Sequence, residues 1–283
     1  MSIEIPNVKL NDGQTLPSIG LGTIDLMGSK GVLQILDALK AGYRLIDTST
    51  NYDNEGIVGK AVRKSGIPRD ELIISSKLPG KFHDFDGALK IIEEQLARTG
   101  LEYFDKYLIH WPNPDDGKYV EAWKALIQAQ KLGLIKTIGV ANFLEPHLEK
   151  IIDETGVTPA TNQIEIQPYF HNKENVAANE KFGIVSEAWS PLGRDLNDAK
   201  EHPALVEIGN KHNKTAPQVI LRWLHQRDIV PIVRSSDPSH QKDNLAIFDF
   251  ELTADEMKTI FALDKGEEGR VEGQHPDEDH EYV

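Results

Sequence analysis

Short apolar runs alternate along the chain with longer stretches in which apolar residues recur every three or four positions. The short runs are typical of buried parallel strands and the longer stretches are typical of amphipathic helices. The pattern predicts strands at residues 19–21, 43–47, 72–77, 106–110, 136–140, 160–166, 184–188 and 229–233. It predicts helices at residues 31–39, 55–64, 87–98, 119–131, 146–153, 174–180, 204–211, 216–225 and 239–246.

Additional elements are predicted at both ends of this alternation. The turn sequence Asn11-Asp12-Gly13 between two short extended runs indicates a β-hairpin before the first strand. A further helix is predicted at residues 252–263, where Thr253 and Glu256 have the spacing of a capping box. We expect the hairpin and this helix to be additions to the repeating strand–helix units.

The number of strand–helix units decides between two α/β folds. Eight units within about 250 residues are typical of the (β/α)8 TIM barrel. The alternative is a doubly wound sheet that binds a dinucleotide at a glycine-rich turn. The only candidate for that turn, residues 20–25 (GLGTID), lacks the third glycine and is followed by no obvious helix start. We therefore predict a (β/α)8 TIM barrel in which residues 1–283 form a single domain.

Composition excludes several classes of function. The chain of 283 residues contains no cysteine, which removes disulfides, thiolate nucleophiles and Cys-ligated metal sites. Its 31 basic and 45 acidic residues give a net charge of −14, which disfavours nucleic-acid binding. Neither a secretory signal nor an apolar run long enough to cross a membrane is apparent. We expect a cytoplasmic protein without nucleic-acid or membrane partners.

Polar residues end three consecutive predicted strands. Asp47, Lys77 and His110 each close an apolar run, and Tyr52 follows Asp47 in the next loop. Barrel enzymes carry their chemistry at the C-terminal ends of the strands, so we expect these four side chains to meet at the barrel mouth. A single such residue is more often a solvated rim residue or part of an ion pair, and only the coincidence on three strands supports a functional site.

These four groups suit the reduction of a carbonyl. A phenol is a poor acid at neutral pH, but a neighbouring ammonium lowers its pKa, and a carboxylate can hold that ammonium in place. Tyr52, Lys77 and Asp47 would supply these three groups, and the His110 imidazole would orient the substrate oxygen. An isomerase or aldolase in which Lys77 forms a Schiff base stays open as an alternative.

Eight segments of the chain are similar to the aldo-keto reductase superfamily, in the order that the family has them. They are GLGT (20–23), IDTSTNYDNEGIVG (46–59), SSKL (75–78), YLIHWP (107–112), IGVANF (138–143), NQIEIQPY (162–169), WSPLG (189–193) and NLAIFDFEL (244–252). Within the family, residues 111–123 (WPNPDDGKYVEAW) and 269–278 (GRVEGQHPDE) resemble bacterial 2,5-diketo-D-gluconate reductase-like members.

The resemblance implies a monomeric enzyme that uses NADPH to reduce aldehydes and ketones to alcohols by hydride transfer. Keto-sugars and dicarbonyls resembling methylglyoxal are candidate substrates, and no metal is expected. The implied catalytic residues are Tyr52 as general acid, Lys77, Asp47 and His110. The implied cofactor-binding residues are Thr23, Asp47, Asn142, Gln163, Trp189, Ser190, Leu192, Arg234, Ser235, His240, Asp243 and Asn244. The implied substrate-binding residues are Ile24, Tyr52, His110 and Trp111.

Departures from the family pattern bear on specificity. His240 stands where an arginine usually contacts the 2′-phosphate of NADP, and Asp237 adds a nearby negative charge. We therefore predict NADPH use with tolerated NADH use. Ala141 stands where a serine commonly helps bind the cofactor carboxamide. Ile24 replaces a common tryptophan of the substrate pocket and Gln167 a common histidine, so the substrate does not follow from the resemblance. A regulatory subunit that binds nicotinamide cofactor without turnover is a second hypothesis.

The end of the chain carries much of the negative charge. Residues 264–283 contain eight acidic residues and two basic ones, a net charge of −6. In the family this segment forms a C-terminal loop over the barrel mouth, where it would disfavour anionic substrates. We interpret its His and acidic residues (His275, Asp277, Glu278, Asp279 and His280) as a solvated tail rather than a metal site.

Overall fold

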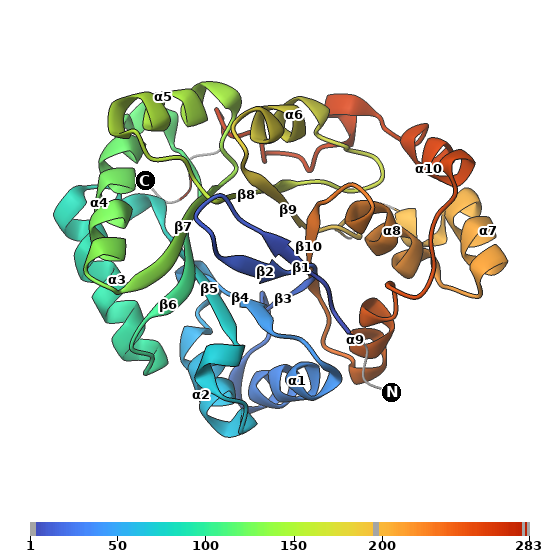
Figure 1. The fold of residues 1–283 in the computed structure, drawn as a ribbon, viewed down its shortest axis with the longest axis horizontal. Helices are drawn as coiled ribbons and strands as arrows, with labels where there is room; N and C mark the ends of the chain where they lie inside the picture. Colours follow the sequence, from blue (N-terminus) through green and yellow to red (C-terminus); the bar gives the residue numbers. More distant parts are fainter. Residues whose placement is uncertain (1–3, 195–197, 279–280, 282–283) are drawn as a thin grey trace.

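Eight parallel strands close into a barrel, which confirms the predicted fold (Figure 1). The computed structural model describes residues 4–194, 198–278 and 281. Around the barrel the strands follow the order β10-β3-β4-β5-β6-β7-β8-β9. Their bounds are β3 Gly20–Gly22, β4 Leu45–Asp47, β5 Ile73–Leu78, β6 Phe104–Ile109, β7 Ile135–Ala141, β8 Thr161–Glu165, β9 Val185–Trp189 and β10 Val230–Arg234.

The helices surround the barrel (Figure 1). In the described ranges they are α1 Gly28–Ala41, α2 Glu55–Ser65, α3 Phe85–Thr99, α4 Tyr119–Lys131, α5 Glu145–Thr155, α6 Lys173–Lys181, α7 Pro203–His212, α8 Ala216–His225, α9 Pro238–Leu245 and α10 Ala254–Phe261. The predicted capping box is present, because Thr253 and Glu256 each accept a backbone hydrogen bond from the other. Helix α10 is shorter than predicted, since Thr253 is extended and caps it from outside. Within the described part of the chain, every helix is too short or too polar to cross a lipid bilayer.

The N-terminal hairpin closes one end of the barrel. Strands β1 (Asn7–Lys9) and β2 (Thr15–Pro17) pair antiparallel and cross the barrel opening in Figure 1. Leu16 packs with Ala160 and with Ile73 and Val185, which lie at or just before the first residues of β8, β5 and β9. The hairpin therefore covers the N-terminal ends of the strands and leaves the C-terminal ends for the site.

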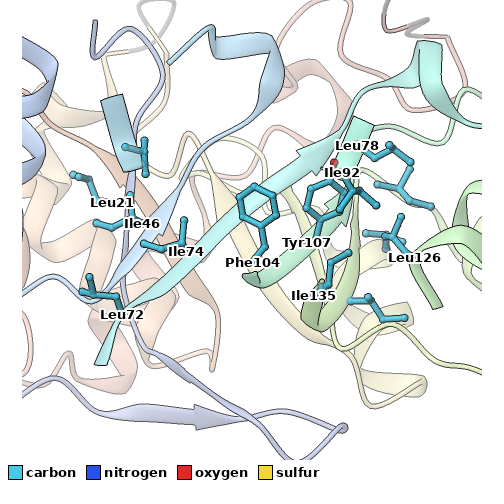
Figure 2. Packing of buried hydrophobic residues seen from close by; sticks show 14 of the residues in the cluster. Leu21, Ile46, Leu72, Ile74, Leu78, Ile92, Phe104, Tyr107, Leu126 and Ile135 are labelled. Carbon is cyan, nitrogen blue, oxygen red and sulfur yellow. The ribbon is translucent and has the colours of Figure 1, made fainter. Parts of the chain in front are cut away.

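Alternation along each strand separates an apolar outer layer from a polar interior. Outward-facing residues such as Ile46, Ile74 and Tyr107 belong to the main hydrophobic cluster beneath the helices (Figure 2). Their neighbours in sequence face the barrel axis, because successive side chains of a strand point to opposite sides. Asp47 and Lys106 are therefore interior residues and both are buried. The interior of this barrel is charged toward its C-terminal end.

Candidate active site

A cavity of about 990 Å³ opens at the C-terminal ends of the strands. Its volume is at the upper end of the range for small-molecule sites. Most of the predicted site residues line it, namely Thr23, Ile24, Asp47, Tyr52, His110, Trp111, Asn142, Gln163, Trp189, Ser190, Leu192 and Arg234. Lys77 lies beneath Tyr52 and is buried. The structure does not bring four predicted cofactor residues into the cavity lining, namely Ser235, His240, Asp243 and Asn244.

A buried ion pair forms the base of the cavity. The Lys77 Nζ donates to Asp47 Oδ1 at 2.5 Å and to the Thr48 carbonyl at 3.0 Å. The two charged side chains are 1% and 3% exposed, so water screens them little. Thr23 holds the Asp47 backbone, since its hydroxyl and its N–H both donate to the Asp47 carbonyl. Strands β3, β4 and β5 are neighbours, which is why these ends meet.

Tyr52 stands over this pair on a short 3₁₀ helix, Thr50–Tyr52, that the Ser49 side chain caps. The Lys77 ammonium lies 5.1 Å from the centre of the Tyr52 ring. Burial raises the pKa of the Tyr52 phenol, and the charge of Lys77 opposes this without overcoming it. This net direction differs from the predicted lowering. The phenol therefore keeps its proton at neutral pH, which suits a proton donor.

The ammonium of Lys77 stays charged despite its surroundings. Burial by itself would lower its pKa, but the charge of Asp47 and the interactions with Tyr52 outweigh burial and raise the pKa above 10.5. The cavity base thus holds a permanent cation beside a neutral phenol. This cation can stabilise negative charge as the phenol gives up its proton.

His110 follows β6 directly, and its backbone N–H donates to the Leu78 carbonyl at 3.1 Å. Its ring meets the Tyr52 ring edge-on at 6.3 Å between centres. A carboxylate from the C-terminal segment contacts it, since Glu281 pairs with His110 Nδ1 and accepts from Asn51 Nδ2. The Gly80 N–H also donates to Glu281, at 3.2 Å. Glu281 therefore fills the donors on one side of the cavity.

The residues that resemble nicotinamide-binding positions are held by hydrogen bonds. Asn142 Oδ1 accepts from the Trp189 indole N–H at 2.7 Å, and Asn142 Nδ2 donates to the His110 carbonyl at 3.0 Å. Both ends of the Asn142 amide are thus engaged within the protein. Arg194 lies over the Trp189 ring at 5.2 Å from its centre. The Gln163 Nε2 donates to Asp47 Oδ2 at 3.1 Å.

The segment after β10 differs from a simple phosphate site. Asp237 caps α9, where its Oδ1 accepts from the backbone N–H groups of Ser239 at 2.7 Å and His240 at 3.4 Å. Helix N-terminal amides of this kind often bind phosphate, and here a carboxylate occupies them. Arg234 donates to the Ile24 carbonyl at 2.9 Å, which ties the ends of β10 and β3 together.

Several residues of the site are not among those predicted from the sequence. Glu281 belongs to the acidic tail, but counting charges does not show which acid enters the cavity. Glu187 and Lys106 are fully buried ion-pair partners in the barrel interior. A signal for them exists, because both are charged residues within predicted buried strands. Asp279 and His280 of the predicted tail lie outside the described residues, and within these no group of three His, Asp or Glu side chains could hold a metal ion.

The buried Glu165 should make the stability of the fold depend on pH. Burial raises the pKa of this residue at the end of β8 from 4.5 to about 7, although the Val271 N–H donates to its carboxylate. Since the folded chain holds the proton more tightly, this contribution to stability is complete below about pH 4.5 and is lost as pH rises through about 7. We expect Glu165 to contribute a loss of about 2–3 kcal/mol over this range, measured as the difference in urea unfolding between wild type and Glu165→Gln. An equal slope in both proteins would contradict this.

Fold and cavity together define a barrel enzyme. A buried ion pair, a phenol and an imidazole surround a cavity at the C-terminal ends of the strands. This is where (β/α)8 barrels carry their active sites.

Comparisons with known proteins identify the family. Residues 18–265 match the model of the aldo/keto reductase family. The chain is 45% identical over 262 residues to 2,5-diketo-D-gluconic acid reductase B of Corynebacterium sp. (strain SHS752001), covering 93% of this chain and 94% of that protein. It therefore belongs to the aldo/keto reductase family, which confirms the predicted family and its oxidoreductase class.

Solved structures agree with this assignment to the family. The crystal structure of an aldo/keto reductase from Brucella melitensis has a TM-score of 0.89 and 41% identity, covering 92% of this chain and 100% of that chain. A Bombyx mori aldo-keto reductase in complex with NADP has a TM-score of 0.88 and 30% identity, covering 97% of this chain and 99% of that chain.

Proposed function

We propose that this protein reduces aldehydes and ketones to alcohols with NADPH, with Tyr52 as the general acid. The observation that carries the proposal is the buried Lys77–Asp47 pair beneath the Tyr52 phenol at the base of the cavity. A buried ion pair is a poor source of stability, so its position under a proton donor favours a chemical role. The relatives support a carbonyl substrate, since one is a diketogluconic acid reductase.

The cavity residues fit a nicotinamide dinucleotide. The Trp189 ring is half-buried and lines the cavity, where it can stack on a flat ring. Gln163 presents an amide to the same space, and Ser190 and Leu192 also line it. The similar Bombyx mori protein binds NADP. When bound, NADPH supplies the hydride for the carbonyl carbon.

The chain's own residues would then handle the substrate oxygen. The His110 ring lies beside the Tyr52 ring, which lies over the Lys77 ammonium, so both side chains can donate to one carbonyl oxygen. As negative charge develops on that oxygen, the Tyr52 phenol gives it a proton. Lys77 stabilises the phenolate that remains, and Asp47 keeps the ammonium in position. Trp111 is buried at the cavity wall and excludes water from one side.

A carbonyl panel tests the proposal. With NADPH, we expect neutral aldehydes such as 4-nitrobenzaldehyde and the dicarbonyl methylglyoxal to cause oxidation of the cofactor with equal formation of alcohol. NADPH binding without turnover of any carbonyl would favour the regulatory-subunit hypothesis instead. Borohydride trapping of a Lys77 adduct without need for NADPH would favour the aldolase alternative.

NADH tolerance is expected from the start of α9. Asp237 occupies the N-terminal amides of α9, and His240 replaces the usual arginine. The 2′-phosphate of NADPH should therefore add little binding energy at this position. We expect the kcat/KM ratio of NADPH to NADH to stay below about a thousandfold. An Asp237→Ser/His240→Arg variant keeps a capping side chain and should raise the ratio about tenfold or more, with NADH efficiency unchanged as the control. An unchanged ratio would contradict this role.

Glu281 should select against anionic substrates. Its carboxylate lies against His110 in the cavity, so a second carboxylate bound there would be repelled. We expect Glu281→Gln to lower the KM for 4-carboxybenzaldehyde by about fivefold or more, which corresponds to about 1 kcal/mol. The KM for the uncharged 4-nitrobenzaldehyde should stay nearly unchanged. Glu278→Gln, an exposed position of the same segment, is the matched control. Equal effects of the two variants would refute the assignment.

A further inference from the structure

A second buried ion pair crosses the barrel interior below the cavity. Lys106 on β6 pairs with Glu187 on β9, and both side chains are 0% exposed. Strands β7 and β8 separate β6 from β9 in the barrel, so the pair spans the interior rather than joining neighbouring strands. Replacing such a pair by apolar residues is often neutral or stabilising, and stability alone gives little reason to keep it.

Glu187 also contacts a residue that lines the cavity. Glu187 and Gln163 are direct partners in the register of β9 and β8. The Gln163 Nε2 lies 3.4 Å from Glu187 Oε2 and 3.1 Å from Asp47 Oδ2. One amide nitrogen therefore donates to two carboxylates, and a different lysine holds each carboxylate. The interior contains a continuous chain of contacts from Lys106 to Lys77.

This arrangement fixes the orientation of the Gln163 amide. A rotated amide would turn its carbonyl oxygen toward both carboxylates, which is strongly unfavourable in a buried site. With Nε2 committed, Oε1 remains as an acceptor, and no donor among the described residues satisfies it. Gln163 lines the cavity, so this acceptor is available to a bound molecule.

We propose that Glu187, held by Lys106, is a positioning residue that directs Gln163 Oε1 toward the carboxamide N–H of a bound nicotinamide. The inference rests on the proposed function, because it needs the nicotinamide to bind in this cavity. Glu187 does not line the cavity and would act only through Gln163. It would give the site a preference for a ring substituent that donates a hydrogen bond.

The test is the ratio of two binding constants. NADPH carries a carboxamide N–H, and its reduced 3-acetylpyridine analogue does not. Titration calorimetry should show that wild type binds NADPH about threefold to tenfold more tightly than the analogue, the value of one hydrogen bond. In a Lys106→Met/Glu187→Gln variant, only the Asp47 carboxylate still fixes the Gln163 amide, so we expect this ratio to fall measurably below the wild-type value. A general structural defect would weaken both dinucleotides equally and leave the ratio unchanged.

Two further variants complete the design. Asp105 also lies on β6 and forms an ion pair with Arg69. Asp105→Asn breaks this other pair and should leave the ratio as in wild type. Glu187→Asp keeps a partner for Lys106 but shortens the reach to Gln163, so it should lower the ratio even if the double variant does not fold. A wild-type ratio near one, or an unchanged ratio in the Glu187 variants that fold, would overturn the inference. Failure of wild type to bind either dinucleotide would instead overturn the proposed function.

Discussion

A Tyr52→Phe variant is expected to lose about 10²- to 10⁴-fold in kcat for carbonyl reduction, which is the usual contribution of a general acid. The substitution removes only the hydroxyl and keeps the ring that lies 5.1 Å from the Lys77 ammonium. Burial raises the pKa of the phenol and keeps it protonated in wild type, so the substitution removes the proposed proton donor itself. Lys77 is held by Asp47 and has its pKa raised, so it is a poor substitute donor.

The controls for this variant separate chemistry from folding and binding. NADPH affinity should change little, since the cofactor contacts proposed for Trp189 and Gln163 do not involve the phenol. Tyr103→Phe is the matched control, because Tyr103 precedes β6 and stacks with Arg69 at the opposite end of the barrel. Turnover in Tyr52→Phe comparable to that in Tyr103→Phe would exclude Tyr52 as the acid.

A Lys77→Met variant should lose stability as well as activity. It leaves the Asp47 carboxylate, 3% exposed, without its cation, and among the described residues the Gln163 amide is then its only side-chain donor. Removing one partner of a buried pair costs about 3–5 kcal/mol. We expect that loss in the free energy of unfolding by urea, together with a fall in kcat, because the phenolate is no longer stabilised.

A double variant distinguishes the two effects of this lysine. Asp47→Asn/Lys77→Met removes the uncompensated charge, so it should recover most of the lost stability while carbonyl reduction stays impaired. This outcome would show that the pair serves the reaction more than the fold. Recovery of activity along with stability would contradict the role assigned to Lys77, and equal instability of both variants would contradict the charge argument.

The fold and the centre of the site could be predicted because they depend on local patterns. Hydrophobic periodicity marks each strand, and parallel strands bring their C-terminal ends to one edge. Asp47, Lys77 and His110 were therefore expected to meet, and the structure places all three around Tyr52. Strand ends were predicted within one or two residues, an error that changes no assignment of a side chain to the barrel mouth.

The remaining features depend on contacts between distant parts of the chain. Glu281 reaches His110 only because the C-terminal segment returns to the cavity, and nothing in its neighbouring residues signals this. The partner of Lys106 could not be identified, because Glu187 lies three strands away around the barrel. The pKa of Tyr52 depends on a balance between burial and the charge of Lys77, and only coordinates show that burial is the larger cause.

The most direct test of the account follows the hydride itself. Wild-type protein would be incubated with NADPH that carries deuterium at the transferring position of its nicotinamide C4 and with 4-nitrobenzaldehyde, and the alcohol would be examined by NMR. Hydride transfer from the cofactor should place one deuterium on the former carbonyl carbon and none on its oxygen, where the proton comes from Tyr52 and exchanges with water. Alcohol without deuterium, or no alcohol from protein shown to bind NADPH, would contradict it.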